Sequence, residues 1–251
     1  MYILGIDTSS MVATVALLSE EKLIAEYIVN NKKNHSEKLM LVLDRVLEDG
    51  GIALEEVDAI AVARGPGSFT GIRIGMACAQ GICHALDKAL IGINTLDGLA
   101  YNLMGESGLL CPVVDAQRGE VYTSLYRWES GNLKRFRDYE VVKAVDLVEE
   151  LMKMPERVVV LGDGAPLVKG FLDEIAADGR KSGSGNNNVC IAHPAFSMPR
   201  ASSIAAAGLK EYINGNFDSC FSIKPFYIRK SNAEEKWEER HGGESSGERG
   251  N

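Results

Sequence analysis

The stretch Gly65-Pro66-Gly67-Ser68-Phe69-Thr70-Gly71-Ile72-Arg73-Ile74-Gly75 decides how the rest of the chain is interpreted. It contains four glycines and one proline, and it lies where a buried strand predicted over 57–63 passes into a helix predicted over 70–86. Glycine permits positive φ and close approach of the backbone, and the first turn of a helix has free N–H groups. Such an element either binds an anion or allows another surface to come very near.

The stretch matches none of the common phosphate-binding loops. It lacks the Gly-x4-Gly-Lys-Ser/Thr pattern, and Thr70 stands where a dinucleotide-binding fold has its third glycine. Arg73 lies in the first turn of the helix, where a cation opposes the helix dipole unless it has a partner. Gly71, Gly75 and Ala79 recur every four residues and share one helix face. Close packing in the chain's own core and docking by a partner explain this seam equally well.

The helix predicted over 36–47 carries an apolar stripe that is wider than a helix with one buried side requires. Together with the small-residue seam, the stripe indicates an interaction face on these two helices. A large side chain at Gly75 or Ala79 is therefore expected to abolish binding of a partner without unfolding the chain. The residues expected in this face are Leu39, Leu43, Val46, Gly71, Gly75 and Ala79.

The composition is that of a soluble globular protein, since 45% of the 251 residues are hydrophobic and 25% are charged. The formal net charge is −8, and no Lys/Arg cluster is large enough to follow a phosphate backbone, which argues against nucleic-acid binding by this chain alone. We interpret the densest basic group as a solvated hairpin; it contains Arg127, Lys134, Arg135 and Arg137.

The five cysteines form no CxxC pair, and we interpret them as reduced thiols. The sequence shows neither a signal peptide before the first predicted strand nor an apolar run of membrane-spanning length. These features indicate a cytoplasmic protein that does not bind a membrane.

The order strand-strand-strand-helix-strand-helix occurs twice along the chain. In the first third the predicted elements are strands over 2–7, 12–18 and 23–29, a helix over 36–47, a strand over 57–63, a helix over 70–86 and a strand over 89–93. In the second third they are strands over 110–114, 120–128 and 136–142, a helix over 145–152, a strand over 157–161 and a helix over 166–177. The repetition predicts an α/β fold of two tandem lobes.

Each predicted lobe has a mixed sheet flanked by helices, as in the actin, sugar-kinase and Hsp70 class. The N-terminal lobe is expected over 1–106, completed by a helix over 202–213, and the C-terminal lobe over 107–200. The composition predicts a flexible loop over 179–188 and a disordered tail over 238–251.

Folds of this class hold a nucleotide between the lobes, and two predicted hairpins offer candidate residues for such a site. Asp7, Thr8 and Ser9 belong to the first hairpin, and Asp115 and Gly119 to the equivalent hairpin of the second lobe. Ser9, however, stands where this fold uses glycine to bring backbone N–H groups to a phosphate. A degenerate nucleotide site and a plain Asx turn at Asp7 both remain possible interpretations.

Metal and nucleophile patterns are poor. The histidines His35, His84, His193 and His241 are isolated from one another and from cysteines, so no metal site is predicted. Ser68 does not lie in a Gly-x-Ser-x-Gly elbow, and no Ser–His–Asp set can be assembled. No catalytic residue is therefore predicted.

Several segments together resemble the TsaB family, and the glycine-rich stretch 65–75 is the most specific of them. The resemblance covers nearly the whole chain to about residue 230, and its segments are 1–10, 35–39, 65–75, 115–122 and 225–229. It implies a noncatalytic subunit of the bacterial machinery that makes threonylcarbamoyladenosine at position 37 of tRNA.

The resemblance also implies partners. A TsaB-like subunit is expected to bind the transferase TsaD through its N-terminal lobe, to be joined by the ATPase TsaE, and to form a homodimer through the same face when alone. No strong direct tRNA binding and no cofactor are expected in this subunit, with ATP at the assembled complex. TsaD carries a His-x-x-x-His metal pair, but Thr95 and Leu99 stand at the matching positions here. Neither side chain is a competent ligand for a divalent metal.

Two other functions remain as alternatives. The first is a stand-alone nucleotide-dependent kinase or ATPase that uses Asp7 and Asp115 across the cleft between the lobes. The second, and the least favoured, is a metallopeptidase.

Overall fold

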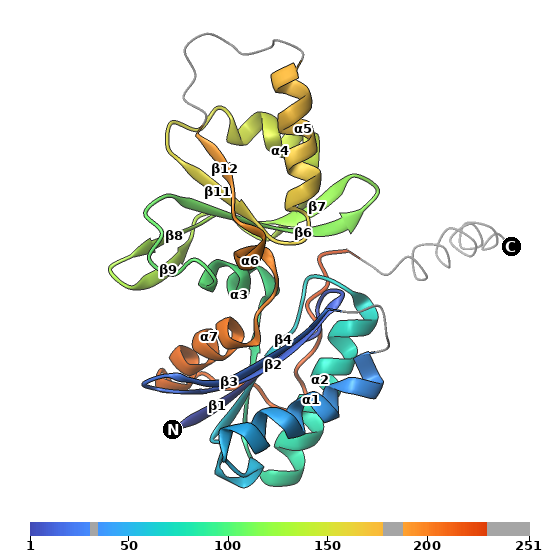
Figure 1. Ribbon diagram of the computed structural model, residues 1–251, viewed down its shortest axis with the longest axis vertical. Coiled ribbons are helices and arrows are strands. Elements are labelled where there is room, and N and C mark those ends of the chain that lie inside the picture. Colours follow the sequence, from blue (N-terminus) through green and yellow to red (C-terminus); the bar gives the residue numbers. More distant parts are fainter. Residues whose placement is uncertain (31–34, 178–187, 230–251) are drawn as a thin grey trace, which may run out of the picture.

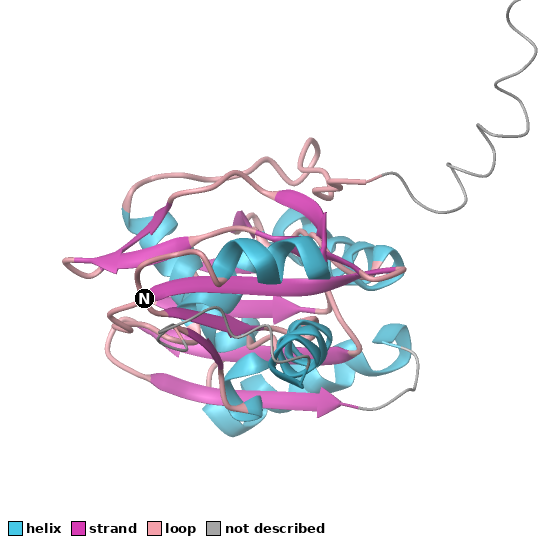
Figure 2. Ribbon diagram, turned by 90° about the horizontal axis from the view of Figure 1, so that it is seen from above, coloured by secondary structure: helices cyan, strands magenta, loops and turns pink. Residues whose placement is uncertain are grey.

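The computed structural model describes residues 1–30, 35–177 and 188–229 and places them in two lobes (Figure 1). The predicted tail over 238–251, and all but the last residue of the predicted loop over 179–188, lie outside the described residues. Each lobe contains a β-sheet, and Figure 2 shows helices on both sides of the strands. Within the described ranges, no helix combines the length and apolar character that crossing a membrane requires.

The N-terminal lobe is built on a five-stranded mixed sheet with the strand order β3-β2-β1-β4-β5. β1, β4 and β5 run parallel to one another, while β2 is antiparallel to both of its neighbours. Apolar residues of β1, β2 and β4 are buried along almost their whole length, because helices cover both faces of the sheet. The strands are β1 (Tyr2–Asp7), β2 (Val12–Ser19), β3 (Leu23–Asn30), β4 (Ala59–Ala63) and β5 (Ala89–Ile93).

One layer of helices covers each face of this sheet. α1 (His35–Gly50) and α2 (Phe69–Leu86) pack on one face, and a short 3-10 helix (Leu54–Glu56) leads into β4. α7 (Ala201–Ile213) packs on the other face, although it follows the C-terminal lobe in the sequence. α3 (Thr95–Tyr101) contacts both α7 and the first strand of the C-terminal lobe, so it lies between the lobes.

The C-terminal lobe repeats this topology with the strand order β10-β7-β6-β11-β12. β6, β11 and β12 are parallel, as β1, β4 and β5 are in the first lobe. The elements are β6 (Leu109–Gln117), β7 (Glu120–Thr123), β8 (Tyr126–Glu129), β9 (Asn132–Arg135), β10 (Glu140–Lys143), α4 (Ala144–Leu151), β11 (Val158–Leu161), α5 (Ala165–Ala177), β12 (Val189–Ile191) and α6 (Pro194–Ser197).

The hairpin β8–β9 is an insertion into the repeat, and it makes two of the predicted strand boundaries wrong. The single strand predicted over 120–128 is two strands, and the strand predicted over 136–142 begins at Glu140. Strand β7 ends at Thr123. The Thr123 hydroxyl donates to Pro112 O at 2.9 Å, and the Ser124 hydroxyl donates to Arg137 O at 2.6 Å. These buried hydroxyl groups bond to the backbone where a continuous strand would be regular.

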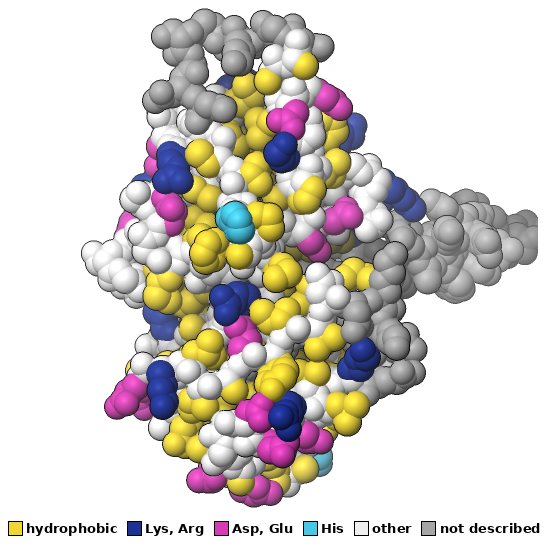
Figure 3. Space-filling model, viewed as in Figure 1, with side chains coloured by type: hydrophobic (Ala, Val, Ile, Leu, Met, Phe, Trp, Pro, Cys, Tyr) yellow, Lys and Arg dark blue, Asp and Glu magenta, His cyan; other side chains and the backbone are white. Residues whose placement is uncertain are grey.

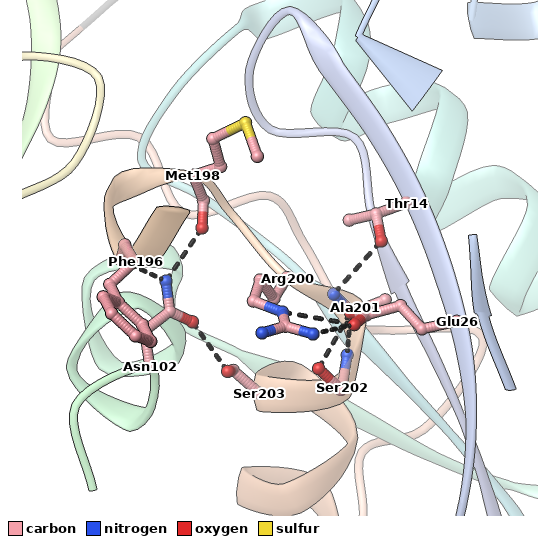
Figure 4. A network of polar contacts seen from close by, with 9 residues as sticks. All are labelled: Thr14, Glu26, Asn102, Phe196, Met198, Arg200, Ala201, Ser202 and Ser203. Carbon is pink, nitrogen blue, oxygen red and sulfur yellow. Dashed lines mark hydrogen bonds and ion pairs between the residues drawn. The ribbon is translucent and has the colours of Figure 1, made fainter. Parts of the chain in front are cut away.

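A network of polar contacts fixes the chain where it returns from the C-terminal lobe to α7 (Figure 4). The Glu26 carboxylate accepts from Ser202 N at 3.0 Å and from Arg200 Nε at 3.1 Å, so a side chain of β3 caps the start of α7. The Asn102 amide, just after α3, donates to Phe196 O and Met198 O, at 2.8 Å each. Side-chain hydrogen bonds therefore join the returning chain both to β3 and to the residue that follows α3.

Candidate functional site

A cleft of about 560 Å³ lies between the two lobes. Its N-terminal wall is formed by the hairpin between β1 and β2 and by the glycine-rich stretch, and its C-terminal wall by the hairpin between β6 and β7. Residues 226–229 line it from the C-terminal end of the described chain. The structure thus brings the two predicted nucleotide-site hairpins and the family motif to one place.

The glycine-rich stretch is held directly against the first hairpin. Ser68 N donates to Ser9 O at 2.6 Å, and the Ser68 hydroxyl caps α2 by accepting from Gly71 N at 3.2 Å. Gly67 has φ of 149°, and a Cβ there would overlap Ser9 O. The peptide bond between Gly65 and Pro66 is cis. This close approach of backbones is the reason for the glycine content at this turn.

Asp7 is buried at the end of β1, where the first hairpin begins, and belongs to an Asx turn. Its Oδ1 accepts from Ser9 N at 2.8 Å and from the Ser9 hydroxyl at 2.6 Å. Burial raises the pKa of Asp7 to about 6, against the two hydrogen bonds, and the nearby charge of Asp163 raises it further. The Ser9 amide, which a phosphate would need, is already bonded to Asp7. The Thr8 hydroxyl donates to Gly71 O at 2.7 Å.

The second hairpin is more open. The Asp115 carboxylate is exposed and accepts from Gln117 N at 2.8 Å, and Asp115 N donates to Asp163 Oδ1 at 3.0 Å. Gly119 has φ of 81° and open space at its Cβ position. Burial raises the pKa of Asp163, and the charge of Asp115 adds to this. Asp163 follows β11 in a two-glycine turn, a signal too weak to select it from the sequence.

Residues 226–229 form a strap across the glycine-rich stretch that pattern reasoning did not assign to the site. Phe226 N donates to Arg64 O at 2.7 Å, and the Tyr227 ring stacks on Phe69 with centroids 4.8 Å apart. Arg73 lies 3.8 Å from the Phe69 ring centroid, and its Nε donates to the Tyr227 hydroxyl at 3.0 Å. These contacts supply the partner that Arg73 requires near the start of α2.

The strap also contacts the C-terminal lobe. Arg229 Nη1 lies 2.6 Å from Glu120 Oε2, and the Phe226 ring meets the Tyr139 ring edge-on at 5.2 Å. Gly65 lies beneath the strap, where a Cβ would overlap Phe226 O, and Pro66 lines the cleft beside it. The strap therefore connects the two lobes over the glycine-rich stretch.

The predicted interaction face is wrong in its choice of side chains. Gly75 and Gly71 face Thr8 of the chain's own first hairpin, and a Cβ at Gly75 would overlap the Thr8 hydroxyl. Ala79 is fully buried in the same core, so a large side chain at Gly75 or Ala79 would disturb the fold itself. Helical spacing correctly places Gly71, Gly75 and Ala79 on one face of α2, but it does not show that the chain's own residues cover this face. The predicted stripe residues are likewise buried in this core: Leu39, Leu43 and Val46.

The opposite, outer face of the same two helices is exposed. Met40 and Leu41 of α1 are 48% and 67% exposed, and Met40 Sδ lies 3.5 Å from Cys78 Sγ of α2. On α2 a second series of small residues is exposed at intervals of four, and a Cβ at its centre would have no neighbour within 4 Å in the described part of the chain. This series consists of Ala77, Gly81 and Ala85. We call these five residues the outer face.

The segment that corresponds to a metal-binding helix contains no ligand pair. Thr95 and Leu99 are both buried, and Leu99 packs among apolar residues of α3 and the C-terminal sheet. In the described part of the chain, no three His, Cys, Asp or Glu side chains gather as a metal-ligand group. His84 instead packs against the Phe221 ring, with centroids 5.0 Å apart.

Basic side chains do not form a continuous track on the face shown in Figure 3, where Lys and Arg lie singly among hydrophobic and acidic side chains. The predicted basic hairpin is the β8–β9 hairpin, in which Arg127 pairs with Glu156 and Lys134 with Glu129. This face therefore offers no continuous positive surface of the kind that nucleic-acid binding requires.

Comparisons with known proteins agree on one family. The family model described as "TsaD: tRNA N6-adenosine threonylcarbamoyltransferase" matches residues 22–237. The "tRNA threonylcarbamoyladenosine biosynthesis protein TsaB" of Bacillus subtilis is 35% identical over 237 residues, which cover 94% of this chain and 98% of the relative. The protein of the same name from Escherichia coli is 31% identical over 155 residues, covering 61% and 67% of the two chains.

Solved structures share the fold. The structure titled "YeaZ from Pseudomonas aeruginosa" has a TM-score of 0.71 and 23% sequence identity, over 90% of this chain and 99% of that chain. A second structure, described as an uncharacterized protein from Pseudomonas aeruginosa with similarity to peptidase YEAZ, has a TM-score of 0.74 at 22% identity, over 91% and 99% of the two chains. The predicted fold class of two tandem α/β lobes is confirmed.

Proposed function

We propose, because the chain belongs to the TsaB family of tRNA threonylcarbamoyladenosine biosynthesis proteins, that it is a noncatalytic subunit of the complex that installs N6-threonylcarbamoyl on adenosine 37 of tRNA. In this role it binds and supports the transferase TsaD, and the ATPase TsaE joins the pair. The subunit brings no metal or cofactor of its own, and ATP acts at the assembled complex.

The observation that carries this proposal is the outer face of α1 and α2. Exposed Met40 and Leu41 supply apolar area, while the exposed small residues Ala77, Gly81 and Ala85 let another helix approach the backbone of α2 closely. An exposed helix pair with apolar and small side chains suits a protein partner. The same face serves for self-association when TsaD is absent.

The contacts of the degenerate sites support a noncatalytic role. A buried hydroxyl at Thr95 and a buried hydrocarbon at Leu99 do not provide a metal-ligand pair. The Ser9 amide and hydroxyl are both bonded to Asp7, so that hairpin has already used the donors that a phosphate would take. A transferase of this fold would need both a metal-ligand pair and free donors for a phosphate.

Measuring the molar mass of the chain alone, and then mixed with TsaD of the same organism, tests the proposal. Size-exclusion chromatography with light scattering should show a homodimer alone and a heterodimer of one copy of each protein in the mixture. A mixture that elutes as two separate, unchanged species at concentrations of about 10 μM would contradict it.

The cleft favours a second candidate function, a stand-alone kinase or ATPase. Asp115 and Asp163 of the C-terminal lobe line the cleft, and buried Asp7 of the other lobe lies near enough to Asp163 for their charges to interact. Carboxylates grouped in this way can position a metal-bound nucleotide. Calorimetric titration of the isolated chain with Mg-ATP separates the two functions. Tight binding, with turnover that Asp7→Ala abolishes, would favour the kinase or ATPase.

A further inference from the structure

A second crevice, away from the cleft, lies where β4 and β5 end and α7 finishes. It has a volume of about 460 Å³ and is lined by residues from four separate parts of the N-terminal lobe. The polar side chains that line it include Arg64, Asn94, Asp97, Glu211 and Asp218. β4 and β5 are parallel, and α2 and α3 follow them on different faces of the sheet. The carboxyl ends of parallel strands at such a point are a common place for ligands.

Two donors at this crevice have no hydrogen-bond partner among the residues that the structure describes. Arg64 Nε and Asn94 Nδ2 are fully buried, and neither makes a hydrogen bond. Asn94 is 2% exposed, and its Oδ1 caps α3 by accepting from Leu96 N at 3.0 Å. The cap fixes which atom of the amide is the oxygen, so the unpaired atom is the NH₂ donor. Buried donors in folded proteins are almost always paired, which indicates a missing acceptor.

Carboxylates surround the same space. Asp218 Oδ2 accepts from Gly92 N at 2.8 Å, and Glu211 Oε2 accepts from Asn216 Nδ2 at 2.7 Å. Asp97 Oδ1 accepts from the Tyr126 hydroxyl at 2.6 Å, and burial raises the pKa of Asp97. Three carboxylates and the Arg64 guanidinium therefore line the crevice, and the Arg135 guanidinium, outside this lining, is near enough to Asp97 to act on its pKa, so that negative charge still predominates. This excess of negative charge favours a ligand that brings a cation.

We propose that this crevice binds a free α-amino acid, whose carboxylate accepts from Arg64 Nε and Asn94 Nδ2 while its ammonium group lies among the three carboxylates. A simple anion would satisfy the two donors but would be repelled by Asp97, Glu211 and Asp218. A simple amine would leave both donors unpaired. The volume is within the range of small-molecule sites. Docking to a partner plays no part in this inference, so the amino-acid site and the proposed docking function can fail independently of each other.

Calorimetric titration of the full chain with the twenty amino acids tests the inference. At least one of them should bind, and its matched amine and matched carboxylic acid, such as ethylamine and propionate for alanine, should each bind at least roughly tenfold more weakly. Absence of binding by all twenty at about 10 mM overturns the inference, and so does equal binding by the matched amine or acid.

Variants identify the site. Asn94→Asp keeps the oxygen that caps α3 but replaces the unpaired donor with a charged acceptor, so affinity should fall by roughly tenfold or more. Asn214→Asp adds the same charge at the exposed end of α7 outside the crevice and should bind as the unchanged chain does. Arg64→Lys removes the Nε donor, keeps the charge and is the second test if Asn94→Asp does not fold. Unchanged affinity in a folded Asn94→Asp or Arg64→Lys chain would overturn the assignment.

Discussion

At the scale of single residues, Asp7 is a carboxyl group in surroundings that disfavour its negative charge. The side chain is buried, it is held by two hydrogen bonds from Ser9, and Asp163 of the other lobe adds repulsion. Ionised Asp7 is therefore costly to the folded state, in contrast to a carboxylate held by a cation. The cost has a measurable dependence on pH.

Asp7→Asn should stabilise the protein above neutral pH. The pKa of Asp7 is about 6 in the folded chain against 3.8 ordinarily, so the folded state binds a proton more tightly and stability falls as pH rises from about 4 to about 6. Asparagine avoids this loss, and the free energy of unfolding should exceed that of the unchanged chain by about 3 kcal/mol at pH 8. The difference should shrink toward zero near pH 4.

Urea unfolding at several pH values measures this difference. Asp44→Asn, on an exposed position of α1, is the control and should give a curve parallel to that of the unchanged chain. Parallel curves for Asp7→Asn as well would show that the charge of Asp7 has no cost.

The two small-residue series of α2 should respond in opposite directions to the same substitution. Gly75→Ala places a methyl group against the Thr8 hydroxyl and should lower the free energy of unfolding by about 1–3 kcal/mol. Gly81→Ala points a methyl group into open space and should raise it by about 0.5–1 kcal/mol, because alanine is the better helix former. Chemical denaturation of both variants checks the signs. A stabilising Gly75→Ala would mean that this face of α2 is not packed as described.

At the scale of elements, α7 depends on a side chain from a distant strand. The side chain of Glu26 in β3 is 6% exposed, and it pairs with Arg200 while it accepts from both the amide and the hydroxyl of Ser202. One carboxylate thus fixes the start of α7 on the N-terminal sheet. The exposed pair of Glu48 with Arg45 on α1 is a useful contrast, since solvent screens it.

Glu26→Ala should lower the free energy of unfolding by about 3–5 kcal/mol, because it leaves Arg200 and the Ser202 amide without their carboxylate partner. Glu48→Ala should change it by less than about 0.5 kcal/mol. Thermal or urea unfolding of the two variants compares them directly. Equal effects of the two substitutions would contradict the role of Glu26 at α7.

The strap over the glycine-rich stretch should loosen when its aromatic contact is removed. Tyr227→Ala deletes the stack on Phe69 and the bond from Arg73, so the Phe226 amide should exchange its hydrogen roughly tenfold faster. Tyr227→Phe keeps the stack and should have a smaller effect. Amides of β1 serve as the internal reference in the same hydrogen-exchange experiment. An unchanged exchange rate at Phe226 in Tyr227→Ala would show that the stack does not hold the strap.

The elements of the N-terminal lobe could be predicted because their signals are local. β1 and β5 are short apolar runs bounded by polar residues, and their observed bounds agree with those expected. The β8–β9 hairpin could not be predicted, because its break depends on hydroxyl groups of Thr123 and Ser124 that bond to distant carbonyl oxygens. Helix α1 extends three residues beyond its expected end at 47.

The candidate site was harder to predict than the elements. Periodicity placed Gly75 and Ala79 on one face, but only the tertiary structure shows that this face meets the chain's own β1–β2 hairpin and core. The outer series, which contains Gly81, has the same spacing of four residues, so periodicity alone does not tell which of the two series is exposed. Similarly, Arg64 and Asn94 have no sequence pattern that marks them, since their unpaired donors become evident only when their neighbours are known.

At the scale of the whole molecule, the two lobes enclose a cleft, while α1 and α2 lie along one side of the N-terminal lobe (Figure 1). The described residues thus separate an internal region with the family motif from an external region suited to a partner. The acidic net charge, and the singly placed basic side chains of the face in Figure 3, support the proposed role of a subunit that acts through a protein partner.

The most direct test of the docking role is the affinity of a Gly81→Arg variant for TsaD. An arginine at this position projects into open space, so the isolated chain should keep its fold, whereas the outer face would be blocked by a long charged side chain. Gly170→Arg on α5 is the matched control, since Gly170 also has no neighbour within 4 Å but lies on the C-terminal lobe. Folded Gly81→Arg should bind TsaD at least roughly a hundredfold more weakly than the unchanged chain, and Gly170→Arg should bind equally well. Binding of folded Gly81→Arg with the affinity of the unchanged chain would contradict the proposed docking face.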